Sequence, residues 1–144
     1  MNFELDEEHR MLRDMVHRFV QEHLMPLEER VMERDAAGEG TYLTAEERAP
    51  IDAKARELGL WGLDAPVDVG GSDLPTIAML AVHEIMGATV TPWNLPPDSP
   101  NLRMLMATVN EDQKRRYLEP YVRDGLTSAI SISEPGAGAD PAGM

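Results

Sequence analysis

Apolar residues recur at steps of three and four along most of this chain, and this spacing constrains the fold more than any other feature. Such a period gathers apolar side chains on one face of an α-helix. The first stretch with this pattern covers residues 6–25 and is carried by Leu5, Leu12, Met15, Val16, Phe19, Val20 and Leu24. Asp6 is the expected N-cap of this helix. Pro26 is expected to end or kink it, because proline removes a backbone donor.

The same reasoning predicts further helices, separated by connections rich in glycine and proline. They cover residues 44–58, 74–90, 102–109 and 110–124, after a helical turn or two that follows Pro26. Thr44 and Glu47 have the spacing of a capping box, which marks the start of the first of these helices. The side chains expected to face the core are Ile77, Leu80, Ala81, Ile85 and Ala88 in the second helix and Tyr117, Leu118, Tyr121 and Val122 in the last.

Near the C-terminus the pattern changes from helical to alternating. Residues 127–133 alternate and include β-branched residues, which is typical of a strand. We therefore predict an all-α fold, a bundle of about five to six helices with one strand-like segment near the C-terminus. The predicted division is a helical domain over residues 1–126, followed by residues 127–144 as the start of another unit.

Charge and composition exclude several classes of function. The chain has 13 basic and 26 acidic residues, a net charge of −13, which argues against nucleic-acid binding because a phosphate backbone needs local cations. It has no cysteine, so disulfides, thiolate metal sites and cysteine nucleophiles are excluded. No apolar run approaches the ~20 residues of a membrane span, and the acidic N-terminus is unlike a targeting leader. We expect a soluble, cytoplasmic protein.

Short motifs of several enzyme classes are present only in part. Gly136 and Gly138 match the beginning of a dinucleotide fingerprint, but Pro141 stands at the third glycine. Whether this segment is a ligand loop or a simple turn stays open. His83 begins a zinc-protease pattern that Gly87 breaks. The other histidines are spaced too irregularly to share a metal, and the serines lack a neighbouring histidine base, so no metal site and no hydrolase nucleophile are predicted.

Four motifs, in order, resemble those of one enzyme family. Residues 131–140 (SISEPGAGAD) resemble a flavin-contacting signature that typically reads TEPGAGSD. Residues 57–63 (ELGLWGL), 94–101 (NLPPDSPN) and 110–118 (NEDQKRRYL) look like three further stretches of that family, the second of them like its APDTGN segment. The family is the acyl-CoA dehydrogenases. The chain resembles their N-terminal helical domain, truncated before the middle β-domain.

The resemblance implies a cofactor, a substrate and a reaction. The cofactor is FAD and the substrate is an acyl-CoA thioester, which undergoes α,β-dehydrogenation. A carboxylate base removes the α-proton, and a hydride leaves the β-carbon for flavin N5. In the family this base lies in a C-terminal domain, so the resemblance assigns no catalytic residue to the present chain.

The resemblance also implies which residues meet the flavin and the substrate. Ile130, Ile132 and Ser133 match positions beside the flavin, and Ser133 keeps the hydroxyl of the family's threonine. The substrate-binding positions are Gly138, Ala139, Ser99 and Leu102. Gly138 matches a glycine near the thioester, whereas Ala139 replaces a serine that binds the CoA part. Ser99 and Leu102 stand where the family lines its acyl pocket.

The end of the chain adds one expectation. It falls where the β-domain of the family begins, which predicts the N-terminal part of an FAD-dependent acyl-CoA dehydrogenase that is inactive alone. Two alternatives stay open: a non-enzymatic helical interaction or oligomerisation module, and one subunit of a split dehydrogenase. We also expect a homo-oligomer, or a partner that supplies the missing domains.

Overall fold

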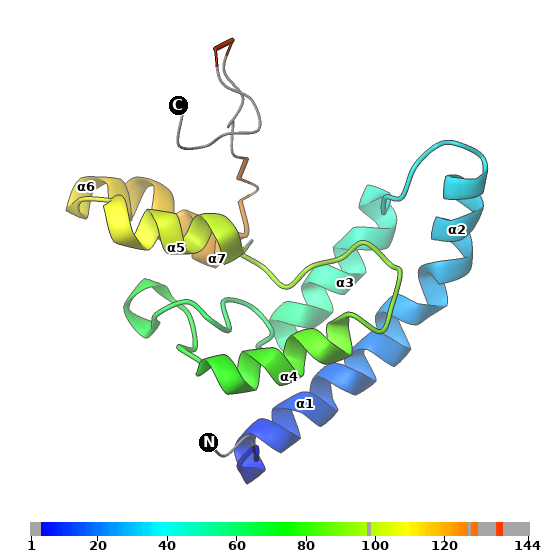
Figure 1. Ribbon diagram of the computed structural model, residues 1–144, viewed down its shortest axis with the longest axis horizontal. Helices are drawn as coiled ribbons and strands as arrows, with labels where there is room; N and C mark the ends of the chain where they lie inside the picture. The colour runs from blue at the N-terminus through cyan, green and yellow to red at the C-terminus, as the bar shows by residue number, and fades with distance from the viewer. Residues whose placement is uncertain (1–3, 98, 127, 130–134, 137–144) are drawn as a thin grey trace.

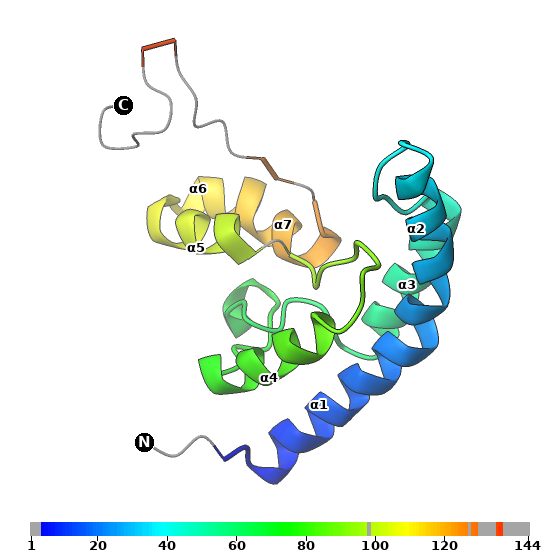
Figure 2. The ribbon, with the colours of Figure 1, turned by 45° about the vertical axis from the view of Figure 1, so that its right-hand side comes forward.

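The computed structural model describes residues 4–97, 99–126, 128–129 and 135–136, and its regular elements are helices and helical turns (Figures 1 and 2). No strand is present among these residues. The strand-like segment predicted over residues 127–133 lies outside them except for Ser128 and Ala129, which are in neither a helix nor a strand. The prediction of an all-α fold is confirmed.

The N-terminal half begins with one long helical rod made of four consecutive elements. α1 (Glu7–Phe19) passes into a π-helical turn, η1 (Val20–Leu24), then into a 3₁₀ turn, η2 (Met25–Leu27), and then into α2 (Glu28–Ala36). Asp6 caps α1 as predicted, since its side chain accepts a 2.8 Å hydrogen bond from the N–H of His9. The regular α-helix ends shortly before Pro26, which lies inside η2 where its missing donor is tolerated.

Two helices pack against this rod. α3 (Ala45–Glu57) begins with the predicted capping box, in which Thr44 and Glu47 bond each other's backbone N–H groups. After a 3₁₀ turn, η3 (Val67–Val69), the chain enters α4 (Thr76–Met86), which lies alongside α1 (Figure 2).

The buried face of α4 differs from the prediction. Its buried residues are Ala78, Met79 and Val82. Of the predicted core residues, Ile77, Ala81 and Ile85 are partly buried, whereas Leu80 is 59% exposed and Ala88 is exposed as well. Almost every position of α4 is apolar, so the spacing alone could not select the inner face. The prediction was wrong at one position of the last helix as well, because Tyr117 is 48% exposed.

The remaining helices form a second group on the other side of α4 (Figure 1). α5 (Ser99–Thr108) is followed by a rod made of α6 (Glu111–Gln113), a π-helical turn, η4 (Lys114–Leu118), and α7 (Glu119–Asp124). Within the part of the chain that the structure describes, no helix has both the length and the apolar character needed to cross a membrane.

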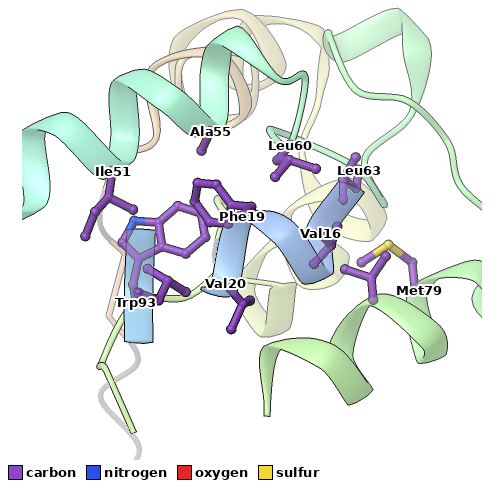
Figure 3. Close-up of a cluster of buried hydrophobic side chains, with 11 residues drawn as sticks. Val16, Phe19, Val20, Ile51, Ala55, Leu60, Leu63, Met79 and Trp93 are labelled. Carbon is purple, nitrogen blue, oxygen red and sulfur yellow. The ribbon is translucent and has the colours of Figure 1, made fainter. Parts of the chain in front are cut away.

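The buried apolar side chains fall into two clusters. The first cluster joins α1, α3 and α4 and contains Val16, Phe19, Val20, Leu24, Ile51, Ala55, Leu60, Leu63, Met79, Val82 and Trp93 (Figure 3). At its centre the rings of Phe19 and Trp93 lie 5.3 Å apart at 56°, a tilted arrangement that aromatic pairs favour. The second cluster joins α5, η4 and α7 to the turn after α3 and contains Ala65, Val69, Leu102, Leu118, Tyr121 and Val122.

Candidate functional site

The residues predicted to meet the flavin, Ile130, Ile132 and Ser133, lie outside the described part of the chain. The same is true of two predicted substrate residues, Gly138 and Ala139. Their roles stay predictions. What the structure does describe is the root of this segment, between the end of α7 and residue 129.

The two other predicted substrate residues lie at the start of α5. Ser99 is the first residue of that helix. Leu102 is fully buried and belongs to the second cluster. Its side chain therefore packs against α7 and the turn after α3, and its proposed contact with an acyl chain stays a prediction.

The end of α7 is held by a first anchor, which consists of Arg56 and Trp61. The guanidinium of Arg56 lies 3.5 Å from the ring centroid of Trp61 and donates a 2.7 Å hydrogen bond to the carbonyl oxygen of Arg123. The indole Nε1 of Trp61 donates a 2.8 Å hydrogen bond to the carbonyl oxygen of Val122. The last carbonyls of a helix have no partners within it, so these two side chains satisfy groups that would otherwise need water.

Gly125 makes the close approach of Trp61 possible. This residue adopts a left-handed conformation with φ +64° and ends α7. A Cβ atom placed here would lie 2.1 Å from Cζ2 of Trp61, so no other residue fits without a shift of the indole. Glycine is therefore required twice, for the backbone conformation and for the contact. Together with the first anchor, it sets the direction in which residue 126 leaves the helix.

A second anchor holds the segment three residues further on. The Nδ2 of Asn101, on α5, donates a 2.5 Å hydrogen bond to the Oγ of Ser128. The Ser128 hydroxyl in turn donates to the phenol oxygen of Tyr121, on α7, at 3.1 Å. Asn101 is only 4% exposed, so this contact is made inside the protein. The first anchor comes from α3 and the turn after it and holds residues 122 and 123, and the second comes from α5 and holds Ser128. Both act shortly before the predicted flavin signature.

The second anchor leaves one polar atom without a partner. The Oδ1 of Asn101 is buried and has no hydrogen-bond donor among the described residues. A flipped amide would present Oδ1 to Ser128 and turn Nδ2 toward the position that Oδ1 now occupies. Buried polar groups in proteins are nearly always paired.

An open pocket of about 560 Å³ lies next to the first anchor. Its walls include Arg48, Asp52, Arg56, Trp61 and Leu126. Asp52 accepts a 2.7 Å hydrogen bond from Nε1 of Trp93 and lies 3.4 Å from Nε of Arg48, so its charge is already compensated. No histidine or serine is among the residues that line this pocket, and its two carboxylates are those of Asp52 and Asp124.

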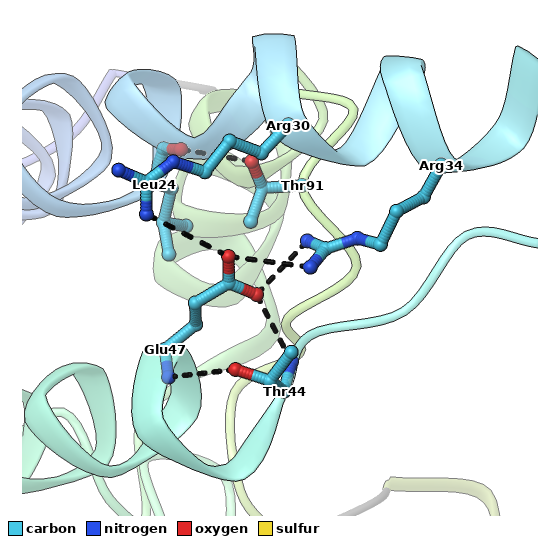
Figure 4. A network of polar contacts seen from close by, with 6 residues as sticks. All are labelled: Leu24, Arg30, Arg34, Thr44, Glu47 and Thr91. Atoms are coloured by element: carbon cyan, nitrogen blue, oxygen red, sulfur yellow. Dashed lines mark hydrogen bonds and ion pairs between the residues drawn. The ribbon is translucent and has the colours of Figure 1, made fainter.

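A polar network joins α2 to α3, far along the chain from the segment root (Figure 4). Glu47 accepts hydrogen bonds from both terminal nitrogens of Arg34, at 2.9 and 3.3 Å, and one from the backbone N–H of Thr44 at 3.0 Å. The Arg34 guanidinium and the Thr44 N–H favour the carboxylate, so they hold the pKa of Glu47 below its ordinary value. The same pairing raises the pKa of Arg34. This network supports the fold.

The described residues can form one side of a cofactor site. They hold no group of three or more acidic or histidine side chains arranged for a metal ion. For a flavin, the described residues offer a segment root that is fixed at two points, by Trp61 and by Asn101.

Comparison with known proteins decides the family. Residues 6–124 match the family model described as acyl-CoA dehydrogenase, N-terminal domain. The chain belongs to the acyl-CoA dehydrogenase family. The family is FAD-dependent in general, and its members act on acyl-CoA and form oligomers.

Three similar proteins illustrate this membership. Over its whole length the chain is 34% identical to (R)-benzylsuccinyl-CoA dehydrogenase of Thauera aromatica and covers 37% of that protein. Over 97% of its length it is 34% identical to mitochondrial isovaleryl-CoA dehydrogenase of Pongo abelii, covering 32% of it. A solved structure of a Mycobacterium abscessus protein assigned as an acyl-CoA dehydrogenase matches 98% of the chain with a TM-score of 0.77 and 28% identity; 38% of that protein is covered. The chain thus spans about a third of the length of the relatives it matches.

Sequence analysis missed the residues that build the two anchors. Trp61 was noted as part of the stretch over 57–63, Gly125 as the residue that closes the last predicted helix, and Asn101 only as the last residue of the stretch over 94–101. One signal for Asn101 was available: it is a polar residue directly before Leu102, where a short apolar helix was predicted to begin. No local pattern connects it to Ser128, which is 27 residues away.

Proposed function

We propose that this chain is the N-terminal helical domain of an FAD-dependent acyl-CoA dehydrogenase and forms one wall of its flavin and substrate cleft. The observation that carries this proposal is the family match over residues 6–124, which ends next to the anchored root of the predicted flavin segment. The residues proposed to contact the flavin are Ile130, Ile132 and Ser133. FAD, when bound, accepts the hydride that leaves the β-carbon of the substrate.

The substrate side of the proposal concerns positioning. Gly138 and Ala139 are proposed to lie near the thioester and the CoA part, and Ser99 and Leu102 near the acyl chain. These residues bind and orient the thioester and carry no group that takes the α-proton, so the base comes from another domain.

A second candidate is a helical module that binds a protein partner. The observation in its favour is a set of exposed apolar side chains, among them Met11 at 67%, Leu80 at 59% and Val90 at 58%. Exposed apolar surface of this kind is typical of interaction sites when it is contiguous. A colourless preparation that forms a dimer through this surface would favour the module over the dehydrogenase domain.

The test compares the chain alone with the chain supplied with the remaining domains. Each sample receives FAD, a panel of acyl-CoA thioesters and an artificial electron acceptor, and reduction of the acceptor is followed. We expect no saturable turnover by the chain alone, and saturable turnover when a β-domain and a C-terminal domain are supplied. Turnover by the chain alone would refute the requirement for other domains. A flavin-loaded assembly that oxidises no acyl-CoA would refute the proposed reaction.

A further inference from the structure

Beyond the roles already proposed, the second anchor has the properties of a device for placing the flavin-bearing segment. Asn101 lies on α5, Ser128 in the segment itself and Tyr121 on α7. Two consecutive hydrogen bonds therefore join three parts of the molecule. α5 also carries Leu102, which packs against Tyr121 within the second cluster. A shift of the segment relative to α5 therefore breaks a hydrogen bond made by a buried amide.

We propose that Asn101 is a positioning residue, whose carboxamide fixes the path of residues 128–129 and thereby aims the flavin and substrate residues that follow. This inference deepens the proposed function and rests on it for the identity of what is aimed.

The unsatisfied atom argues for positioning and against a purely structural role. A buried acceptor without a partner destabilises a fold by about 1–3 kcal/mol, and an apolar residue of the same shape would avoid that loss. Leucine has nearly the shape of asparagine and would extend the second cluster. A site under selection for stability alone would therefore favour leucine at position 101, whereas aiming the segment requires the amide.

The test uses the absence of cysteine from the chain. Ala129 is exposed in the segment and Met104 is 49% exposed on α5, so A129C and M104C provide two sites for spin labels without competing thiols. The width of the label-to-label distance distribution measures how firmly the segment is held. A second pair on the body of the bundle, M11C with M32C, reports whether the fold itself has changed.

Three substitutions separate the possibilities in the 144-residue chain. We expect both N101L and S128A to broaden the distance distribution of the M104C–A129C pair. The distance distribution of the M11C–M32C pair should stay the same in both variants. The melting temperature should be unchanged in S128A and unchanged or raised in N101L. S128T keeps the hydroxyl and should keep the distribution narrow. S128A changes a half-buried residue outside the helices, so it tests the anchor even where N101L disturbs α5. Narrow distributions in both N101L and S128A would overturn the proposal.

The assembled enzyme supplies the functional measurement. Misplacement of reacting groups by about 1 Å can lower a rate about a hundredfold, so N101L and S128A should lower kcat by one to two orders of magnitude with a smaller change in KM, and S128T should restore it. An unchanged kcat in both variants would contradict the aiming role. A wild-type assembly with no acyl-CoA turnover but with the expected label distributions would refute the proposed reaction and leave the anchor intact.

Discussion

The two hydrophobic clusters differ in how they are held together. The first cluster is large, centred on Phe19 and Trp93, and assembled from helices whose inner faces mostly follow the spacing of apolar residues. The second is smaller, and the helices around it carry the hydrogen bonds of Trp61 and Asn101 that hold the outgoing segment. The comparison suggests a division of roles, in which the first cluster forms the scaffold of the domain and the contacts around the second cluster hold the segment that leaves α7. Apolar packing dominates the first cluster, although Trp93 at its centre also donates a hydrogen bond to Asp52. The hydrogen bonds of Trp61 and Asn101 hold the outgoing segment.

The largest effect is expected from truncation of the first cluster. Phe19→Ala should lower the free energy of unfolding by about 3–5 kcal/mol, because it removes a fully buried ring and leaves a cavity. Urea unfolding followed by circular dichroism measures this change. Met11→Ala, at a side chain 67% exposed on the same helix, should change stability by no more than about 0.5 kcal/mol. Equal effects of the two substitutions would remove the distinction between the cluster and the surface.

The next effect concerns the close contact between Gly125 and Trp61 at the end of α7. Gly125→Ala combines a left-handed backbone with a clash against Trp61 and should destabilise the chain by about 1–3 kcal/mol more than Gly38→Ala. Gly38 is the matched control, since it has φ +77° and nothing within 4 Å of an added Cβ. Urea midpoints of both variants give the difference. If they agree, backbone strain explains the whole effect, and the contact with Trp61 has no role.

The polar network between α2 and α3 predicts a dependence on pH. The pKa of Glu47 is lowered by folding, so its contribution to stability is fully present above the ordinary glutamate pKa of about 4.3 and is lost as pH falls through the lower folded pKa. Glu47→Gln removes this contribution. The stability curves of wild type and variant, measured by urea unfolding from neutral to acidic pH, should therefore lie apart at neutral pH and converge in acid. Parallel curves would contradict the lowered pKa.

The smallest effect is expected at the cap of α3. Thr44→Ala removes the side-chain acceptor of a 3.3 Å hydrogen bond from the N–H of Glu47 and should lower stability by about 1 kcal/mol. Thr44→Ser keeps the acceptor and should be close to wild type in thermal unfolding. A serine variant as unstable as the alanine variant would show that the methyl group of Thr44 matters, and the cap would not explain the difference.

What the sequence could predict follows the same division. Asp6, Thr44 and Glu47 were predicted correctly because caps depend on residues within four positions. The inner face of α4 was not predicted correctly, because an almost wholly apolar helix has no polar face that marks the solvent side. Leu80 was predicted to lie in the core, although it is exposed. The number and type of elements therefore depend on local chemistry, and the choice between apolar faces depends on the partner helix.

The candidate site could be predicted only in part, for a related reason. Its signature at residues 131–140 was found by resemblance to a family, which the match over residues 6–124 supports at the level of family membership. The contacts that hold its root join residues 27 positions apart, Asn101 and Ser128, and 61 positions apart, Trp61 and Val122. No periodic pattern encodes such pairs, since their partners are set by the packing of α5 and α7.

The most direct measurement of the central claim is the absorbance of bound flavin when a stoichiometric amount of acyl-CoA is added without oxygen. The account predicts that the chain assembled with its remaining domains binds FAD and loses the oxidised-flavin absorbance, whereas the isolated chain with FAD shows no change. Equal bleaching by the isolated chain, or no bleaching by a flavin-loaded assembly with any acyl-CoA, would contradict it.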